Sequence, residues 1–212
     1  MRDPYLYEDV DILKNKLDIK EQDLLDAAEA DYVTYRLKDL AMNPIPGKYN
    51  TEHFLEMHRY IFQDLFDWAG MPRTILIYKE EDVLGGQSVE YSDPFDIVRD
   101  LHQVLSDMRK KDWASMNRKM LAEEFCDTLA KLWKIHPFRE GNTRTTVTFC
   151  CQYADELGIV INRKLFEDHA RYVRTALVAY NAYFSDGNDF SKREYLEKIV
   201  YDAMSANEST VQ

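Results

Sequence analysis

His136-Pro137-Phe138-Arg139-Glu140-Gly141-Asn142-Thr143-Arg144 is the stretch around which the chain is organised. An apolar helical pattern ending at Trp133 precedes it, and the run Thr145–Leu157 that follows also has helical spacing. A proline and a glycine interrupt any continuous helix between the two. The sequence therefore predicts a helix–loop–helix junction whose loop carries an imidazole, a carboxylate, two guanidiniums and an amide. Folding alone rarely needs so many reactive groups in so short a stretch.

The overall composition is that of a globular domain with a sizeable core. Of the 212 residues, 45% are hydrophobic and 13% aromatic, which suffices for one large domain or two small ones. No apolar run approaches the roughly 18 residues of a membrane-spanning helix, and the first residues lack the apolar segment of a signal peptide. We therefore expect no membrane partner and a cytoplasmic protein, acting in the cell that makes it or, as a delivered effector, in a host cell.

The net charge of −11 argues against nucleic acid as a partner, because a phosphate backbone would be repelled. An anionic ligand would need a locally positive pocket. The cysteines, Cys126, Cys150 and Cys151, are odd in number, and two of them are adjacent on an expected helix. This usage is typical of a reduced protein in which cysteine is a small, buried apolar residue.

Apolar residues recur at helical spacing along almost the whole chain. The expected helices cover residues 19–41, 51–65, 93–108, 121–133, 145–157, 165–180 and 195–204. Proline and glycine separate several of them, as in Asn43–Gly47 and Gly70–Pro72. The sequence therefore predicts a single all-α domain of about seven helices over residues 1–204, followed by a polar, disordered tail at residues 205–212.

One stretch has strand character instead. Arg73–Tyr78 is rich in β-branched and aromatic residues, Gly85 and Gly86 follow in a loop, and Ser88–Tyr91 can return alongside. A two-stranded hairpin is marginal by itself, so we expect it to lie on the helices, with one edge open to an extended partner segment. An ordinary surface hairpin explains the pattern as well.

The junction does not match several common kinds of site. The seven glycines of the chain form neither a Walker loop nor a dinucleotide fingerprint. His136 and Glu140 have the spacing of a helical metal pair, but Pro137 and Gly141 interrupt the helix that would bring them together. No Cys/His or Ser/His/Asp arrangement for nucleophilic catalysis is recognisable either.

What remains fits an anion site. Gly141 lets the backbone come close to a ligand, and Asn142 or Thr143 can cap the next helix, whose free N–H groups attract anions. Arg144 adds a guanidinium suited to phosphate oxygens, and Glu140 adds an oxygen ligand for Mg²⁺. The histidine of the stretch has the pKa of a base that can accept a proton from a hydroxyl. From the chemistry alone, solvated charges and a helix-ending histidine explain the stretch equally well.

The stretch resembles the signature of the Fic family, H-P-F-x-[D/E]-G-N-G-R-x-x-R. Seven of its positions stand in this sequence: His136, Pro137, Phe138, Glu140, Gly141, Asn142 and Arg144. Asp3–Tyr7, Asp11–Leu17 and Phe66–Thr74 are also similar to the family. The resemblance therefore covers most of the chain, from about Asp3 to about Met204.

The resemblance implies a Fic fold and the transfer of AMP from ATP to a Tyr, Thr or Ser hydroxyl of a target protein. By that similarity His136 is the general base, and Glu140 holds Mg²⁺ on the α- and β-phosphates. Gly141 and Asn142 form the anion hole, and Arg144 holds the leaving β-phosphate. Such chemistry needs positioning and charge neutralisation more than covalent help.

The resemblance also implies roles for neighbouring residues. The residues expected at the nucleotide are Arg139, Gly141, Asn142, Thr143, Arg144, Ile75, Ile77 and Asn181. Among them Ile75, Ile77 and Asn181 are candidates for the purine pocket, and Phe138 is expected to anchor the loop in the core. The hairpin Arg73–Tyr91 corresponds to the family's flap, on which the target protein docks by strand addition.

Two departures from the signature concern the donor and its control. Thr143 stands where the family usually has glycine, and Val147 stands where a second arginine engages the γ-phosphate. UTP, GTP, or a phosphoryl or phosphocholine donor therefore stays open beside ATP, as does a binding module without turnover. Many Fic proteins are blocked by a helix bearing [S/T]-x-x-x-E-[G/N], but no Ser or Thr here has Glu four residues on. Control then comes from a separate antitoxin that acts in another way, or is absent.

Overall fold

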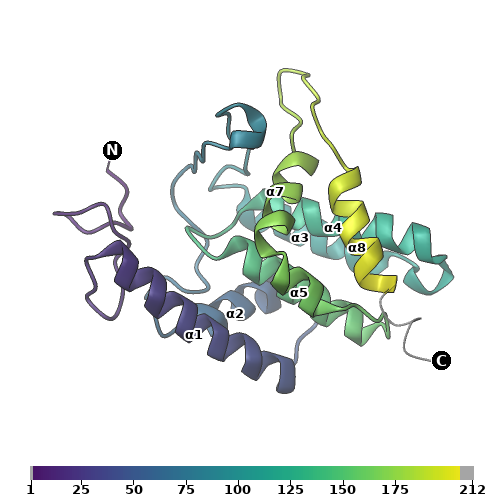
Figure 1. The fold of residues 1–212 in the computed structure, drawn as a ribbon, viewed down its shortest axis with the longest axis horizontal. Helices are drawn as coiled ribbons and strands as arrows, with labels where there is room; N and C mark the ends of the chain where they lie inside the picture. The colour runs from purple at the N-terminus through teal and green to yellow at the C-terminus, as the bar shows by residue number, and fades with distance from the viewer. Residues whose placement is uncertain (1, 206–212) are drawn as a thin grey trace.

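The computed structural model describes residues 2–205, which form eight α-helices and two short 3₁₀ helices (Figure 1). The α-helices are α1 (Gln22–Met42), α2 (Thr51–Phe62), α3 (Ile97–Lys110), α4 (Arg118–Ile135), α5 (Asn142–Glu156), α6 (Arg163–Asp168), α7 (Ala170–Tyr180) and α8 (Glu194–Ser205). The 3₁₀ helices are η1 (Asp82–Leu84) and η2 (Trp113–Ser115). The predicted all-α class is confirmed. Apart from Ser205, the predicted tail lies outside the described residues.

Helices α4 and α5, which flank the junction, are at the centre of the fold. Figure 1 shows α1 and α2 on one side of α5, with α4, α7 and α8 on the other. Both central helices bury residues around most of their circumference, because neighbouring helices cover several of their faces. Cys126, Cys150 and Cys151 are among these buried residues and all three are free thiols, as expected.

The predicted helix over residues 165–180 is two helices. His169 leaves the helical conformation, with φ −119° and ψ 29°, and separates α6 from α7. Phe166 before the bend and Val173 after it are both buried in the core. Hydrophobic spacing reports which face is apolar, and that face continues across the bend, so the pattern alone did not reveal the break.

The flap, residues 73–91, contains η1 near its tip and has no β-ladder, so its two predicted strands are absent from the described residues. Its arms are joined by few hydrogen bonds: the N–H of Glu81 donates to the Gln87 carbonyl (3.1 Å), and the N–H of Lys79 donates to the Ser88 hydroxyl (3.1 Å). Side chains still alternate as in a strand, with Leu76 and Tyr78 about 70% exposed and their neighbours turned inward. Strand propensity thus predicted the alternation of the side chains but not the pairing of the arms.

Among residues 2–205, no helix combines the length and the apolar composition that crossing a bilayer requires.

Candidate active site

The junction loop, residues 136–141, begins and ends in left-handed backbone conformations. His136 has φ 51° and donates its N–H to the Trp133 carbonyl (3.1 Å), which closes α4. Gly141 has φ 82° and stands directly before α5. A Cβ at this glycine would come within 2.3 Å of the Phe62 ring, so both the backbone angle and the available space require glycine here.

The side chain of Asn142 holds the loop closed. Its Oδ1 accepts from the N–H of Phe138 (2.9 Å), and its Nδ2 donates to the carbonyl of the same residue (2.8 Å). Phe138 is fully buried, as expected of the anchor of the loop. This use of the Asn142 amide leaves main-chain N–H groups as the anion donors of α5. Thr145 is the first residue whose N–H bonds back into the helix, to the Gly141 carbonyl (3.0 Å), so the N–H groups just before it point out of the helix end.

The imidazole of His136 is buried and makes no hydrogen bond. Its ring stacks on Tyr91, with centroids 4.0 Å apart, and meets Trp133 edge-on at 5.3 Å. Neither ring nitrogen has a hydrogen-bond partner in the described part of the chain. Burial, and then the positive charges of Lys79 and Arg73, hold the pKa of His136 well below its ordinary value. The imidazole is therefore a neutral base with free lone-pair capacity, covered by Tyr91.

Glu140 is ionised and partly neutralised by the flap. Its Oε1 accepts from the N–H of Gly141 (2.9 Å), and its Oε2 lies 3.5 Å from the ammonium of Lys79. Burial favours the neutral acid, but Lys79, the Gly141 N–H and Arg144 outweigh it and keep the pKa of Glu140 below its ordinary value. The carboxylate is thus available as an oxygen ligand.

The residues at the junction fit a Mg²⁺ ion that takes some of its ligands from the protein and the rest from a nucleotide. No group of three or more His, Cys, Asp or Glu side chains within residues 2–205 could hold a metal by itself. Mg²⁺ is commonly bound by one or two carboxylates together with substrate phosphates, and Glu140 supplies one carboxylate beside the anion-binding end of α5. The predicted metal role of Glu140 is therefore chemically consistent and stays a prediction.

The two arginines of the junction are both paired with carboxylates from the N-terminal part of the chain. Arg139 donates from Nε to Asp3 (2.8 Å). Arg144 donates to Glu29 of α1, and its guanidinium lies over the Phe62 ring at 5.0 Å. Neither pairing could be read from the sequence, because the partners are more than 100 positions apart.

Thr143, which departs from the family signature, also has a defined partner. Its Oγ1 accepts a hydrogen bond from the indole Nε1 of Trp133 (2.8 Å). The hydroxyl therefore ties the first turn of α5 to the end of α4. Val147, the second departure, lies one turn further along and lines a cavity of about 280 Å³ with Thr143, Arg144 and residues of α1, α6 and α7.

His58 is a residue whose importance the sequence did not reveal. Its side chain is fully buried. Its Nδ1 accepts from the N–H of Gly70 (2.8 Å) and its Nε2 donates to the Glu140 carbonyl (3.1 Å), while its ring stacks on Phe138 with centroids 3.6 Å apart. Burial lowers the pKa of His58 to about 3, so the ring is neutral. It connects α2 to the junction loop and to Gly70, which lies before the flap.

The flap is fastened at both ends by arginines. Arg73 is buried and donates from Nε to the His136 carbonyl (2.8 Å). At the tip, Arg174 of α7 donates twice to the carboxylate of Glu81, at 2.8 and 2.6 Å. Such bidentate pairs fix orientation as well as distance, which accounts for an ordered flap without a β-ladder.

The three candidates for the purine pocket differ in their surroundings. Ile75 and Ile77 are half-buried on the flap, and their place at the purine stays a prediction. Asn181 is buried, and its Nδ2 donates to the carbonyls of Ala130 (3.1 Å) and Leu177 (3.0 Å). These bonds connect α7 to α4 and give the Asn181 amide a structural role, while its assignment to the purine stays a prediction.

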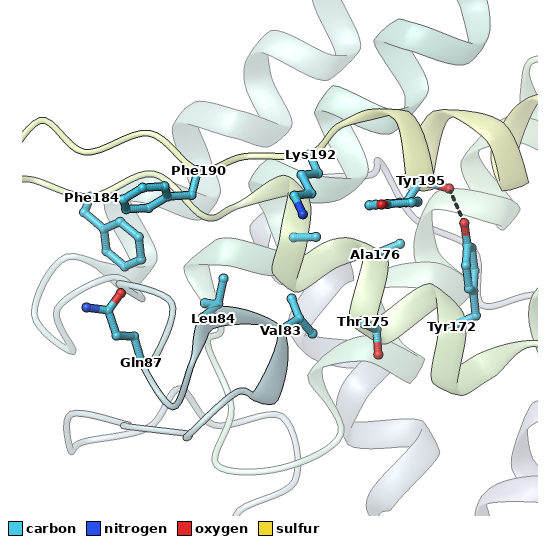
Figure 2. Close-up of a pocket in the computed structure, with 11 residues that line it drawn as sticks. Val83, Leu84, Gln87, Tyr172, Thr175, Ala176, Phe184, Phe190, Lys192 and Tyr195 are labelled. Atoms are coloured by element: carbon cyan, nitrogen blue, oxygen red, sulfur yellow. Dashed lines mark hydrogen bonds between the residues drawn. The ribbon is translucent and has the colours of Figure 1, made fainter.

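A larger cavity, of about 680 Å³, lies between the flap tip, α7 and the segment before α8 (Figure 2). Its lining is mostly apolar and aromatic, with Lys192 reaching in from one side: Val83, Leu84, Gln87, Tyr172, Thr175, Ala176, Ala179, Phe184, Phe190, Lys192 and Tyr195. No residue of the junction lines it. The reactive groups therefore belong to the smaller cavity and to the loop itself.

The two central helices thus bring an open helix N-terminus, a neutral buried histidine and an ionised carboxylate together at one loop. Residues 48–154 match the Fic/DOC family, about half of the chain, and the chain belongs to this family. The resemblance stated from the sequence is thereby confirmed.

The similar proteins are named protein adenylyltransferases. The protein adenylyltransferase VbhT of Bartonella schoenbuchensis is 28% identical over 160 residues, which cover 76% of this chain and 32% of VbhT. The probable protein adenylyltransferase Fic of Escherichia coli is 25% identical over 170 residues, 80% of each chain. The match thus spans about a third of VbhT and most of the E. coli protein.

Solved structures share the fold. BepC of Bartonella tribocorum, a VirB-translocated effector solved with bound AMPPNP, superposes with a TM-score of 0.77 at 20% identity, covering 94% of this chain and 95% of that chain. The N-terminal Fic domain of a VirB-translocated Bep effector from Bartonella quintana, solved with bound ADP, gives 0.74 at 22% identity, covering 94% and 93%. Identities this low establish the fold, and the roles of individual site residues stay predictions.

Proposed function

We propose that this chain is a protein adenylyltransferase, which transfers AMP from ATP to a Tyr, Thr or Ser hydroxyl of a target protein. The observation that carries the proposal is the neutral, unpaired imidazole of His136 beside the open N-terminus of α5. A base needs an unprotonated nitrogen, and a phosphate needs N–H donors. Relatives named protein adenylyltransferases, and Fic structures with bound AMPPNP and ADP, support the same chemistry.

The proposed reaction assigns one task to each residue. His136 accepts the proton of the target hydroxyl while its oxygen bonds to the α-phosphorus, and the bond from that phosphorus to the bridging oxygen breaks, releasing pyrophosphate. The first N–H groups of α5 stabilise charge on the phosphates, and Arg144 binds the β-phosphate that leaves. Glu140 would hold Mg²⁺, which when bound supplies further charge neutralisation on the phosphates.

The target has to reach an imidazole that Tyr91 covers. Because both ring nitrogens are buried, the Tyr91 ring, 4.0 Å away, must move aside before a hydroxyl can approach. Within the described part of the chain, the N–H groups of residues 75–78 have no hydrogen-bond partner. An extended target segment can therefore pair with this arm of the flap, which would present its hydroxyl to the loop.

A second candidate function is nucleotide binding without turnover. It is favoured by the ion pairs that Arg139 and Arg144 already make with carboxylates, and by Val147, which brings no charge to the cavity beside Arg144. The same features leave UTP, GTP, or a phosphoryl or phosphocholine donor as alternatives to ATP. We place the reaction in the cytoplasm of the producing cell, with a separate antitoxin as regulator. A host cell is the alternative setting, because several structural relatives are VirB-translocated effectors.

Nucleotides labelled at the α-phosphate distinguish these candidates. The full chain is incubated with Mg²⁺, a cell lysate and labelled ATP, UTP or GTP in turn, and labelled proteins are analysed by intact mass. We expect AMP on protein with ATP, and none with His136→Ala, while His102→Ala, a change at an exposed histidine of α3, leaves labelling intact. Transfer that survives His136→Ala would refute the assigned base. ATP binding by calorimetry without any transfer would support the binding module instead.

A further inference from the structure

The ion pair between α1 and the junction joins a charged group of the site to a residue outside the matched family region. Arg144 stands in the first turn of α5, and its Nη2 donates to Oε1 of Glu29 in α1. The family match begins at residue 48, so Glu29 precedes it. The Glu29 side chain is only 17% exposed, and Arg144 is the partner that the structure gives it among the described residues.

Three contacts together fix the guanidinium of Arg144. The carboxylate of Glu29 holds one edge, the ring of Phe62 lies 5.0 Å from its central carbon, and Glu140 lies 4.0 Å from Nη2. A guanidinium has five N–H donors in a rigid fork. Because the Glu29 bond uses Nη2, the donors on Nη1 and Nε remain for another acceptor, and the plane in which they point is set.

We propose that Glu29 is a positioning residue for nucleotide binding, which orients Arg144 so that its remaining donors meet the β-phosphate. The inference rests on the proposed function, which assigns the β-phosphate to Arg144. A flexible arginine must be ordered when it binds a phosphate, whereas an arginine already held by a carboxylate and a ring has lost that freedom beforehand. The N-terminal helix is then part of the site and not only of the scaffold.

The opposite reading, in which Glu29 competes with the phosphate for Arg144, makes a different prediction. A competing carboxylate would hold back binding, so its removal would tighten the nucleotide. A positioning carboxylate acts through its hydrogen bond, so removal weakens binding, and glutamine, which keeps an oxygen acceptor at the same place, largely restores it. Comparing alanine with glutamine at position 29 thus separates the effect of the negative charge from the effect of the hydrogen bond that the side chain accepts.

Calorimetric binding of AMP, ADP and ATP to the full chain tests the proposal without needing catalysis. For Glu29→Ala we expect ADP and ATP to bind about tenfold more weakly while AMP, which has no β-phosphate, binds as before; Glu29→Gln recovers most of the loss. Asp31→Ala removes an exposed carboxylate from the same helix and is the matched control for charge. In the background of Arg144→Ala, the substitution of Glu29 should have no further effect.

The outcomes separate the inference from the proposed function. If Glu29→Ala binds ADP as tightly as the unaltered chain, or more tightly, the positioning role is wrong while adenylyl transfer is untouched. Equal weakening of AMP and ADP would also overturn it, since that result indicates a general loss of structure. If the unaltered chain binds none of the three nucleotides, the proposed function itself fails. Circular dichroism and thermal unfolding of each variant show whether the fold is retained.

Discussion

The unfolding free energy of the chain should fall when the pH is lowered from 7 to 5. Replacing His58 with glutamine should make this fall smaller by about 2 kcal/mol. The pKa of His58 falls from the ordinary 6.5 to about 3 in the folded chain because the ring is buried. On acidification the unfolded chain therefore takes up the proton first, and unfolding becomes easier. The contribution of the neutral His58 ring to the unfolding free energy is fully present above pH 6.5 and is lost progressively down to about pH 3.

The magnitude follows from the two pKa values. At pH 7 about a quarter of the unfolded chains carry the proton on this histidine, whereas at pH 5 nearly all do and the folded chain still does not. The difference amounts to about 2 kcal/mol at pH 5 and approaches about 5 kcal/mol below pH 3. His136 adds a loss of the same sign, because its pKa is lowered for the same reason. The test therefore compares how much unfolding free energy the unaltered chain and the variant each lose between pH 7 and pH 5, because the pH dependence of one protein alone includes both histidines.

Urea unfolding of the full chain at pH 7 and pH 5 measures this difference. Glutamine offers both a donor and an acceptor, so His58→Gln can still reach Gly70 and Glu140 while it does not titrate. His102→Gln, at an exposed position of α3, is the matched control. If His58→Gln loses as much stability between pH 7 and pH 5 as the unaltered chain, the argument is refuted. Should the variant not fold, NMR of the histidine rings decides instead: titration of His58 near pH 6 in the folded chain refutes it equally.

Three further outcomes test other parts of the site. Tyr91→Ala should raise the pKa of His136 towards its ordinary value, because the substitution reduces the burial that is the largest cause of the shift. NMR titration of the imidazole measures this pKa, and an unchanged value would show that the Tyr91 ring does not cause the burial. Gly141→Ala should destabilise the fold by about 2 kcal/mol or more and abolish nucleotide binding, since the new Cβ meets a ring at 2.3 Å and φ is 82°; an unaltered midpoint of thermal unfolding would show that the loop adapts. Glu81→Gln should speed proteolytic cleavage of the flap severalfold by weakening its bond to α7, whereas Glu80→Gln, an exposed neighbour, should not.

The sequence contains the signals that make the junction, and these were sufficient to predict it. Pro137 and Gly141 mark where α4 and α5 separate, and the structure places the left-handed residue Gly141 directly before α5. These are local effects: each depends on the conformational preferences of a residue and its immediate neighbours. The predicted helices of the chain were likewise found with one exception, at His169.

What the sequence did not reveal depends on contacts between distant segments. Tyr91 over His136, Lys79 beside Glu140, and Glu29 beside Arg144 join residues 45, 61 and 115 positions apart. No periodicity or propensity encodes such pairs, because they exist only after the helices pack. Asn181 is a further example. Its amide is suited to a nucleobase, but in the structure it donates to main-chain carbonyls of α4 and α7.

The pairing of charges within the junction has a consequence for binding. Arg139 has Asp3, Arg144 has Glu29 and Glu140 has Lys79, so a phosphate or a metal ion meets groups that already have counter-ions. Binding through Arg139 or Glu140 is an exchange of partners, which yields less free energy than pairing a bare charge, whereas Arg144 keeps Glu29 and offers its remaining donors. The main-chain N–H groups of α5 and the neutral imidazole are not neutralised in this way. The N–H groups should therefore contribute most of the affinity for the phosphates, and the arginines should mainly set the orientation of the nucleotide.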